Sequence, residues 1–237
     1  MNASANSDLM GDRVYELVHQ GDDVYRGIDP DGFEKIMYGW NSDSEAFLEV
    51  IEETRPKYIL EIGSWLGASA IHMAKFVKEV GLDTKIVCVD TWLGSREFMG
   101  KGFPGDRSKL FSNGLPAAYG HFLANVKREG VHDTVIPVPQ TSSNALRFFS
   151  EQGVMFDAVY IDGSNQYEDI RSDMHLSWNV LKEGGVMFGD DYTNFSYPQI
   201  NSAVNSFVYS NRLKEYFRVR GDGSFWSLKK KDRGFGL

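Results

Sequence analysis

The stretch that decides the fold covers residues 58–69 and reads YILEIGSWLGAS. It begins with a short, mostly apolar run from Tyr58 to Ile62, which is typical of a strand buried on both faces of a sheet. Gly63 ends that run, and apolar side chains then recur at helical spacing from Ala68 to Val80. A strand, a glycine turn and a helix in this order predict the first unit of an α/β fold with a parallel sheet.

The same alternation continues along the chain. Apolar runs predict further strands at residues 85–90, 134–138, 156–162 and 184–188, with helices at 118–128 and 167–181. The C-terminal end differs, because only three residues separate β-rich runs at 216–220 and 224–228, and so short a link requires an antiparallel hairpin. The predicted fold class is therefore α/β, with a doubly wound, mostly parallel sheet that ends in a C-terminal antiparallel hairpin.

The segment before this sheet is polar and mixed, with a helix expected around Arg13 to His19. Ser42-Asp43-Ser44-Glu45 predicts a capping box, in which the Ser42 hydroxyl accepts from the Glu45 amide. The helix that follows must end near Arg55, because Pro56 disfavours a helical residue before it. We expect residues 1–56 to form an N-terminal helical cap segment and residues 57–237 the sheet core, in one domain spanning 1–237.

Composition narrows the class of protein. A chain of 237 residues with 24% charged residues is the size and composition of one ordinary globular domain. The net charge of −8 argues against a nucleic-acid partner, which would need a basic face. The single cysteine excludes an internal disulfide and a four-thiolate zinc site. With neither an apolar run of membrane-spanning length nor a secretory signal, we expect no membrane partner and a cytoplasmic location.

The glycine loop after the first strand predicts a ligand site. Glycine at positions 63 and 67 lets backbone amides approach a ligand, and the helix N-terminus adds partial positive charge. The G-x-x-x-G spacing differs from the G-x-G-x-x-G of dinucleotide sites, and Trp65 occupies space that a pyrophosphate would need. Asp90, at the end of the second strand, can accept the hydroxyls of a ribose. The structural alternatives are tight helix–strand packing for the glycines and loop capping for Asp90.

Acidic residues follow two further strands. Asp162 comes after the fourth predicted strand, and Asp190 and Asp191 come after the fifth. Because parallel strands end at the same edge of a sheet, these three carboxylates should converge beside the ligand crevice. Clustered anions need a cation between them, and oxygen ligands favour Mg²⁺. The alternative is that Asp162 only shapes the cofactor site and the other two acids cap a loop.

Residues 58–191, with these loops and acids, resemble the small class I S-adenosylmethionine-dependent methyltransferases. The resemblance implies a Rossmann-like methyltransferase fold with S-adenosylmethionine as cofactor, and it places the adenine near Gln140-Thr141-Ser142. Asp90-Thr91-Trp92 is also similar to a motif of one branch of that family. The cofactor-binding residues implied in this way are Glu61, Gly63, Ser64, Gly67, Asp90, Thr91, Ser142 and Asp162.

The three acids are similar to the metal triad of the macrocin-type O-methyltransferases, which act on antibiotic sugars. The resemblance implies Mg²⁺ at Asp162, Asp190 and Asp191, with Asp162 and Asp191 as catalytic residues. In that family the metal ion holds a substrate hydroxyl and lowers its pKa, so that an alkoxide attacks the cofactor methyl group. The implied acceptor is a small hydroxylated molecule such as a sugar or glycoside.

Several alternatives stay open at this point. Ser164 and Asn165 stand where relatives carry Asp, Lys or His, and neither residue readily accepts a proton, which leaves solvent, His121 or His175 as the base. Competing functions are a metal-free N- or O-methyltransferase and a cofactor-binding module without turnover. A nicotinamide-dependent oxidoreductase is disfavoured by the glycine spacing. Assembly into a homo-oligomer is a further open alternative.

Overall fold

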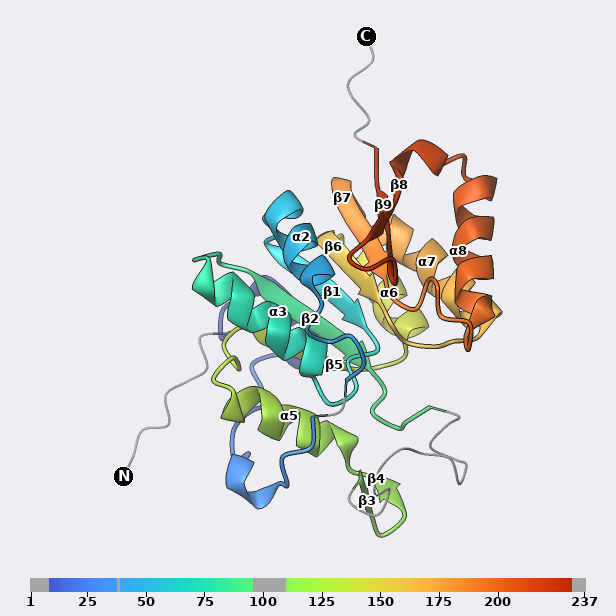
Figure 1. The fold of residues 1–237 in the computed structure, drawn as a ribbon. Coiled ribbons are helices and arrows are strands. Elements are labelled where there is room, and N and C mark those ends of the chain that lie inside the picture. The colour runs from blue at the N-terminus through green and yellow to red at the C-terminus, as the bar shows by residue number, and fades with distance from the viewer. Residues whose placement is uncertain (1–8, 38, 96–109, 232–237) are drawn as a thin grey trace.

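A computed structural model describes residues 9–37, 39–95 and 110–231 of the chain, and its centre is a seven-stranded sheet (Figure 1). Five strands run parallel, and the last two add an antiparallel hairpin at one edge. The predicted fold class is therefore confirmed. In spatial order the strands are β5 (Val135–Pro139), β2 (Lys85–Asp90), β1 (Tyr58–Ile62), β6 (Phe156–Ile161), β7 (Leu181–Gly189), β9 (Phe225–Lys229) and β8 (Phe217–Arg220).

Helices cover both faces of this sheet. In the view of Figure 1, α2 and α3 lie in front of the strands, and α6 and α7 lie behind them, with α8 packed against α7. Each helix buries an apolar stripe against the sheet, as the α/β alternation requires. The bounds are α2 (Glu45–Thr54), α3 (Ala68–Glu79), α5 (Ala118–Arg128), α6 (Ser142–Glu151), α7 (Tyr167–Val180) and α8 (Pro198–Ser210).

The strand order reverses at β1, which pairs with β2 on one side and with β6 on the other. Chain connections leave these neighbouring strands in opposite directions, so a crevice opens beyond their carboxyl ends. Gly63, Asp90, Asp162 and Asp190 directly follow or end β1, β2, β6 and β7. The topology therefore brings the predicted site residues to one edge of the sheet.

An aromatic cluster joins the N-terminal segment to the sheet. The Phe47 ring of α2 lies 4.9 Å from Tyr160, 5.8 Å from Phe188 and 5.4 Å from Phe225, measured between ring centroids. All four side chains are buried, and burying one such ring stabilises the fold by about 1.5–3 kcal/mol. This cluster makes α2 part of the core that supports β6, β7 and β9.

The outer strand β5 is covered by residues from the start of the chain. The Tyr25 hydroxyl donates to the Val135 carbonyl (2.9 Å), and a ring nitrogen of His19 lies 2.8 Å from the Pro137 carbonyl oxygen. His19 ends α1 (Arg13–His19), and a short 3₁₀ turn (Pro30–Gly32) follows it. Because an uncovered edge strand invites pairing with other chains, these contacts protect this edge of the sheet.

Most predicted elements are confirmed within one or two residues, but the capping box is wrong. The helix begins at Glu45, and the Ser44 hydroxyl, not that of Ser42, accepts from the Ala46 amide at 3.3 Å. Two helices, α6 and α8, were not predicted, and β7 begins three residues before the expected strand. A small hairpin of β3 (Phe111–Ser112) and β4 (Leu115–Pro116) lies outside the main sheet. Within the described ranges, every helix is too short or too polar to cross a bilayer.

Candidate functional site

The turn after β1 is built so that only glycine fits at its first position. Gly63 has φ +86°, and a Cβ atom there would lie 2.2 Å from the Asp162 carbonyl oxygen and 2.6 Å from Gly163 Cα. The Asp162 amide in turn donates to the Ile62 carbonyl at 2.8 Å. The predicted cofactor loop and the first predicted metal ligand are therefore in direct backbone contact.

The loop leads into a helix whose N-terminus has no side-chain cap among the described residues. Gly67 is the N-cap of α3, with φ +88°, and a Cβ atom there would lie 3.1 Å from the Phe122 ring. The first amides of a helix have no partner within the helix and attract negatively charged groups. The α3 N-terminus can therefore receive an anionic group of a ligand, such as the carboxylate of an amino acid.

A buried polar group supports the loop from beneath. Glu61 is fully buried and accepts hydrogen bonds from the Ser69 hydroxyl (2.5 Å) and the Cys88 thiol (3.4 Å). Burial raises the pKa of Glu61, while the Ser69 hydrogen bond opposes that rise. The Ser64 hydroxyl is also buried and lies close enough to affect the Glu61 pKa, but it makes no hydrogen bond of normal geometry to any described group. An unpaired buried hydroxyl beside the glycine turn suits a ligand with a polar end.

Asp90 holds the loop through both of its oxygens. It accepts from the Trp65 amide (2.8 Å) and from the Trp92 amide (2.7 Å). Burial raises the Asp90 pKa, and these backbone donors act in the opposite direction. The carboxylate remains partly exposed at the end of β2, so its free lone pairs can still accept ribose hydroxyls.

The predicted adenine segment lies next to this strand end. The Gln140 amide donates to the Asp90 carbonyl at 3.0 Å, and Ser142 begins α6 behind its N-cap, Thr141. Thr91 accepts from the Leu93 amide at 3.2 Å and shapes the loop that follows Asp90. These predicted cofactor residues therefore gather at the same edge as Gly63, although each has a local structural role as well.

The three acids lie close enough to perturb one another. Asp190 is buried, and its pKa is raised to about 7 by burial and then by the charge of Asp191. Asp162 has a large exposed surface, yet protein atoms crowd its carboxyl group. Loss of hydration and then the charges of Asp190 and Asp191 raise its pKa well above the usual range. Carboxylates that repel one another in this way form a site in which a cation would be stabilised.

The side chains of Asp162, Asp190 and Asp191 do not converge on one point. In the described part of the chain, no three Asp, Glu, His or Cys side chains converge as metal ligands would. Asp191 has φ +56° and accepts from the Asn194 amide group at 2.8 Å, whereas Asp162 accepts from the Tyr160 hydroxyl at 3.2 Å. The donor set consists of carboxylate oxygens, and the pKa values of Asp162 and Asp190 are raised, which fits Mg²⁺ or a similar hard cation.

Asn41 lies beside the acids of the site and was not predicted from the sequence. The Asn41 side chain lies close enough to Asp190 to lower the pKa of that carboxyl group. Asn41 has φ +52°, a conformation that asparagine tolerates better than most residues. The only signal in the sequence was an asparagine shortly before a helix, which gave no reason to pair it with an acid 149 positions later.

The expected position of a general base is filled by residues engaged elsewhere. The Ser164 hydroxyl donates to Asp169 at 2.8 Å. The His121 ring packs edge-on against Phe33 (5.3 Å between centroids), and the His175 ring packs against Phe207 (4.9 Å). These contacts leave the general base unassigned.

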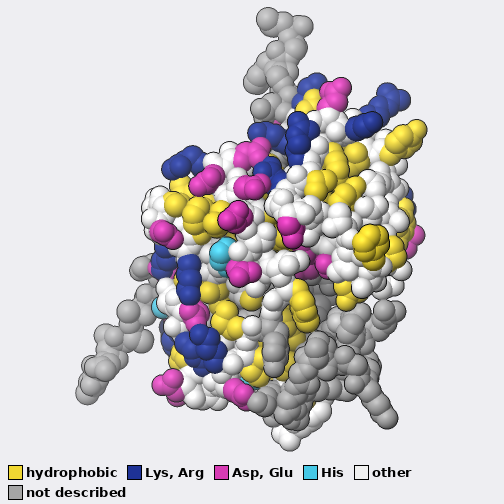
Figure 2. All heavy atoms as spheres, in the orientation of Figure 1, with side chains coloured by type: hydrophobic (Ala, Val, Ile, Leu, Met, Phe, Trp, Pro, Cys, Tyr) yellow, Lys and Arg dark blue, Asp and Glu magenta, His cyan; other side chains and the backbone are white. Residues whose placement is uncertain are grey.

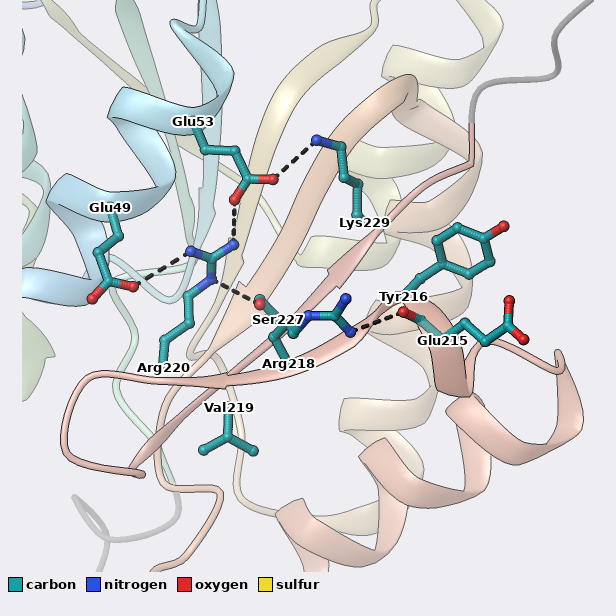
Figure 3. A pocket seen from close by; sticks show the side chains of 9 residues that line it. All are labelled: Glu49, Glu53, Glu215, Tyr216, Arg218, Val219, Arg220, Ser227 and Lys229. Atoms are coloured by element: carbon teal, nitrogen blue, oxygen red, sulfur yellow. Dashed lines mark hydrogen bonds and ion pairs between the residues drawn. The ribbon is translucent and has the colours of Figure 1, made fainter.

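A separate pocket of about 410 Å³ lies between α2 and the terminal hairpin (Figure 3). Four of its charged side chains are paired: Arg220 contacts Glu53 and Glu49, and Lys229 lies 3.0 Å from Glu53. The Arg220 Nε also donates to the Ser227 hydroxyl at 2.8 Å. None of the predicted site residues line this pocket, and its satisfied charges fasten the hairpin to α2.

Comparisons with known proteins give the family and the fold of the chain. Residues 60–192 match the family described as "Methyltransferase domain". An uncharacterized protein of Acanthamoeba polyphaga mimivirus is 26% identical over 99 residues, which cover 41% of this chain and 40% of that protein. The chain thus matches well under two thirds of that curated relative.

Solved structures share the fold. The O-methyltransferase NovP has a TM-score of 0.62 at 17% identity, over 95% of this chain and 99% of the other. The calicheamicin methyltransferase CalS11 gives 0.53 at 17% identity, over 78% and 76%. TomG of Streptomyces achromogenes, in complex with S-adenosylmethionine, gives 0.51 at 17% identity, over 83% and 82%. At sequence identities of 17%, these similarities establish a shared fold.

Proposed function

The chain belongs to the methyltransferase-domain family, and from this premise we propose that it methylates a hydroxyl oxygen of a small, sugar-like acceptor with the help of a divalent metal ion. It is an S-adenosylmethionine-dependent methyltransferase, and this assignment excludes the alternative of a nicotinamide-dependent oxidoreductase. The observation that carries the proposal is the contact between Gly63 and the Asp162 backbone. A cofactor seated on the glycine turn would lie beside the three acids.

The chain's own residues would hold the cofactor in an extended pose. The Gly63–Gly67 loop and the α3 N-terminus would receive the amino-acid end, with the Ser64 hydroxyl and the buried Glu61 beneath it. Asp90 would accept ribose hydroxyls, with Thr91 beside it, and the segment ending at Ser142 would contact the adenine. A cofactor held by these residues would have its methyl group on the side of Asp162.

The acids would position the acceptor. Asp162, Asp190 and Asp191 would hold Mg²⁺, which lowers the pKa of a coordinated hydroxyl when it is bound. The acceptor oxygen attacks the methyl carbon while the carbon–sulfur bond breaks, and the electron pair of that bond returns to sulfur to give S-adenosylhomocysteine. The hydroxyl proton leaves to solvent or to a base. Alignment of oxygen, carbon and sulfur supplies much of the acceleration.

Two observations support a sugar-like acceptor. The solved structure with the related fold, CalS11, carries the description TDP-rhamnose 3'-O-methyltransferase, and a polyol acceptor suits an acidic, hydroxyl-binding edge. The net charge of −8 supports a small-molecule acceptor over nucleic acid. A cytoplasmic location, homo-oligomeric assembly and the single-domain division at residue 57 stay predictions.

A methyl-transfer assay tests the proposal. Purified protein is incubated with methyl-labelled S-adenosylmethionine and a panel of sugars, nucleotide sugars and phenols. Label transfer is measured before treatment with a chelator, after it, and after Mg²⁺ is added back. We expect transfer to a sugar-like hydroxyl that stops on chelation and returns with Mg²⁺. Transfer that is unaffected by chelation would favour the metal-free methyltransferase. Cofactor binding without transfer to any acceptor would favour the silent binding module.

A further inference from the structure

Two tryptophans beside the cofactor loop have an unusual backbone conformation. Trp65 has φ +45° and Trp92 has φ +52°, in the left-handed region where bulky residues are genuine outliers. Such conformations persist only where the surrounding structure determines them, and they concentrate at functional sites. Trp65 occupies the middle of the glycine loop, and Trp92 lies two residues after Asp90.

Three hydrogen bonds join these residues in a closed ring. The Trp65 amide donates to Asp90 Oδ2 at 2.8 Å, and the Trp92 amide donates to Asp90 Oδ1 at 2.7 Å. The Trp92 indole Nε1 then donates to the Trp65 carbonyl at 2.6 Å. Both backbone polar groups of Trp65 are therefore fixed by side chains from the end of β2.

The Trp92 ring is itself held in place. It is 2% exposed, and its centroid lies 4.8 Å from those of both Tyr119 and Phe122 on α5. Phe122 also packs against Gly67, the other end of the loop. The buried Trp92 side chain thus contacts the middle of the loop at Trp65, and Phe122 on α5, which packs against the Trp92 ring, contacts the end of the loop at Gly67.

We propose that Trp92 is a positioning residue for the cofactor: its indole N–H holds the Trp65 peptide in the left-handed conformation and thereby sets the backbone of the Gly63–Gly67 loop. The inference rests on the proposed function, in which this loop receives the amino-acid end of S-adenosylmethionine. A purely structural Trp92 would instead fill space between β2 and α5, and its N–H would have no specific effect on cofactor affinity.

A double-mutant cycle separates these roles. Trp92→Phe keeps an aromatic ring and removes only the donor, whereas Trp65→Gly places at position 65 a residue that adopts a positive φ without strain. The N–H should matter when residue 65 is tryptophan and should matter much less when it is glycine. The readout is the dissociation constant of S-adenosylhomocysteine, measured by titration calorimetry on the full chain, and thermal unfolding verifies that each variant folds.

We expect Trp92→Phe to weaken S-adenosylhomocysteine binding about tenfold in the natural sequence, the size of effect that follows from losing one buried hydrogen bond. In the Trp65→Gly background the same change should alter binding by less than about twofold, because coupled residues are non-additive. Trp178→Phe, on α7, is the matched control and should leave affinity unchanged. Equal effects of Trp92→Phe in both backgrounds, or no effect in either, would overturn the proposal.

The result also distinguishes failure of the positioning role from failure of the proposed site. Gly67→Ala places a methyl group 3.1 Å from the Phe122 ring at the N-cap of α3 and should weaken cofactor binding if the loop is the binding site. If Gly67→Ala weakens binding and Trp92→Phe does not, only the role of Trp92 is wrong. If both variants bind as the natural protein does, the cofactor does not use this loop.

Discussion

Two groups of acids at opposite parts of the sheet behave in opposite ways. At the carboxyl edge, Asp162 and Asp190 have raised pKa values, because burial and neighbouring carboxylates both oppose their charge. At the hairpin edge, burial of Glu53 also opposes its charge, but Arg220 and Lys229 outweigh that effect and lower its pKa. Acidic and basic side chains lie next to one another over α2 and the adjoining hairpin, as Figure 2 shows.

This difference distinguishes the ion-paired cluster at the hairpin from the acids of the proposed site at the carboxyl edge. Where the chain supplies its own cations, the acids fasten α2 to β8 and β9, and the charges are satisfied. At the carboxyl edge no described Lys or Arg side chain pairs with Asp162 or Asp190, and neighbouring acids raise the pKa values of both. We therefore place the proposed function at the carboxyl edge, although a pocket of about 410 Å³ also lies beside the hairpin.

The largest effect expected from this comparison is on turnover. Asp162→Asn should lower the methyl-transfer rate about 10²–10³-fold, because it removes a carboxylate that would hold the metal ion, and with it the group that lowers the pKa of the acceptor hydroxyl. The thermal midpoint should stay the same or rise, since one source of repulsion disappears. Activity assays and thermal unfolding on the same preparation measure both. A large loss of stability with the acid removed would contradict the comparison.

At the level of backbone, the turn at Gly63 should be far less tolerant than a distant turn. Gly63→Ala should lower the free energy of unfolding by about 3 kcal/mol or more, because its Cβ would overlap the Asp162 carbonyl. Gly81→Ala is the matched control, with φ +69° but nothing within 4 Å of the added carbon, and about 1 kcal/mol is expected. Chemical denaturation compares the two. Equal losses would mean that the contact between the loop and Asp162 is not as close as described.

Substitution in the ion-paired cluster of Glu49, Glu53, Arg220 and Lys229 should lower stability and leave turnover unchanged, the reverse of what we expect for Asp162. Arg220→Gln leaves Glu53 and Glu49 without their main cation, and the Arg220 side chain is only 15% exposed. We expect a loss of about 1–2 kcal/mol in the free energy of unfolding, reduced from the fully buried value by the exposure of the acids. The turnover of the folded variant should match that of the natural protein. A fall in turnover at unchanged cofactor occupancy would show that this pocket takes part in function.

A smaller, pH-dependent effect should mark Asp173, a third kind of acid. It is buried on α7 and forms no ion pair with any described residue; burial raises its pKa to about 6, while the nearby Ser142 side chain opposes the rise. The folded state therefore binds a proton more readily than the unfolded state. Its contribution is largest below about pH 4 and is lost as the pH rises through 6.

Asp173→Asn should remove that decline, which we expect to be about 2 kcal/mol between pH 4 and 6. The measurement is urea denaturation at several pH values with the natural protein beside the variant. Glu53→Gln supplies the opposite control, because a lowered folded pKa contributes stability above the unfolded pKa and loses it as the pH falls. Parallel profiles for all three proteins would contradict the contrast between paired and unpaired acids.

Local patterns predicted most of the fold. The buried strands, the glycine turn and the link of Gly221-Asp222-Gly223 were sufficient for the parallel sheet and the terminal hairpin. The N-terminus of α2 was misplaced because Ser42 and Ser44 are both good caps, and tertiary packing decides between them. Helix α8 was missed, and its N-cap position, Tyr197, makes no side-chain cap that could have marked where the helix begins.

The site was predictable only where topology fixes it. Strand ends in a parallel sheet share one edge, so Asp90, Asp162 and Asp190 could be placed together from their positions alone. The role of Asn41 could not be predicted, because its contact with Asp190 depends on how the N-terminal segment folds back. The hydrogen bond from Trp92 to Trp65 likewise depends on two left-handed residues that no periodicity reveals.

The most direct test is a crystal structure of the protein grown with S-adenosylhomocysteine and Mg²⁺. We expect the amino-acid end of the nucleoside on the turn from Gly63 to Gly67, the ribose against Asp90, and an ion among Asp162, Asp190 and Asp191. An ion-free acid cluster with the nucleoside in place would remove the metal and leave the cofactor site intact. A nucleoside bound away from the Gly63 turn would contradict the central claim.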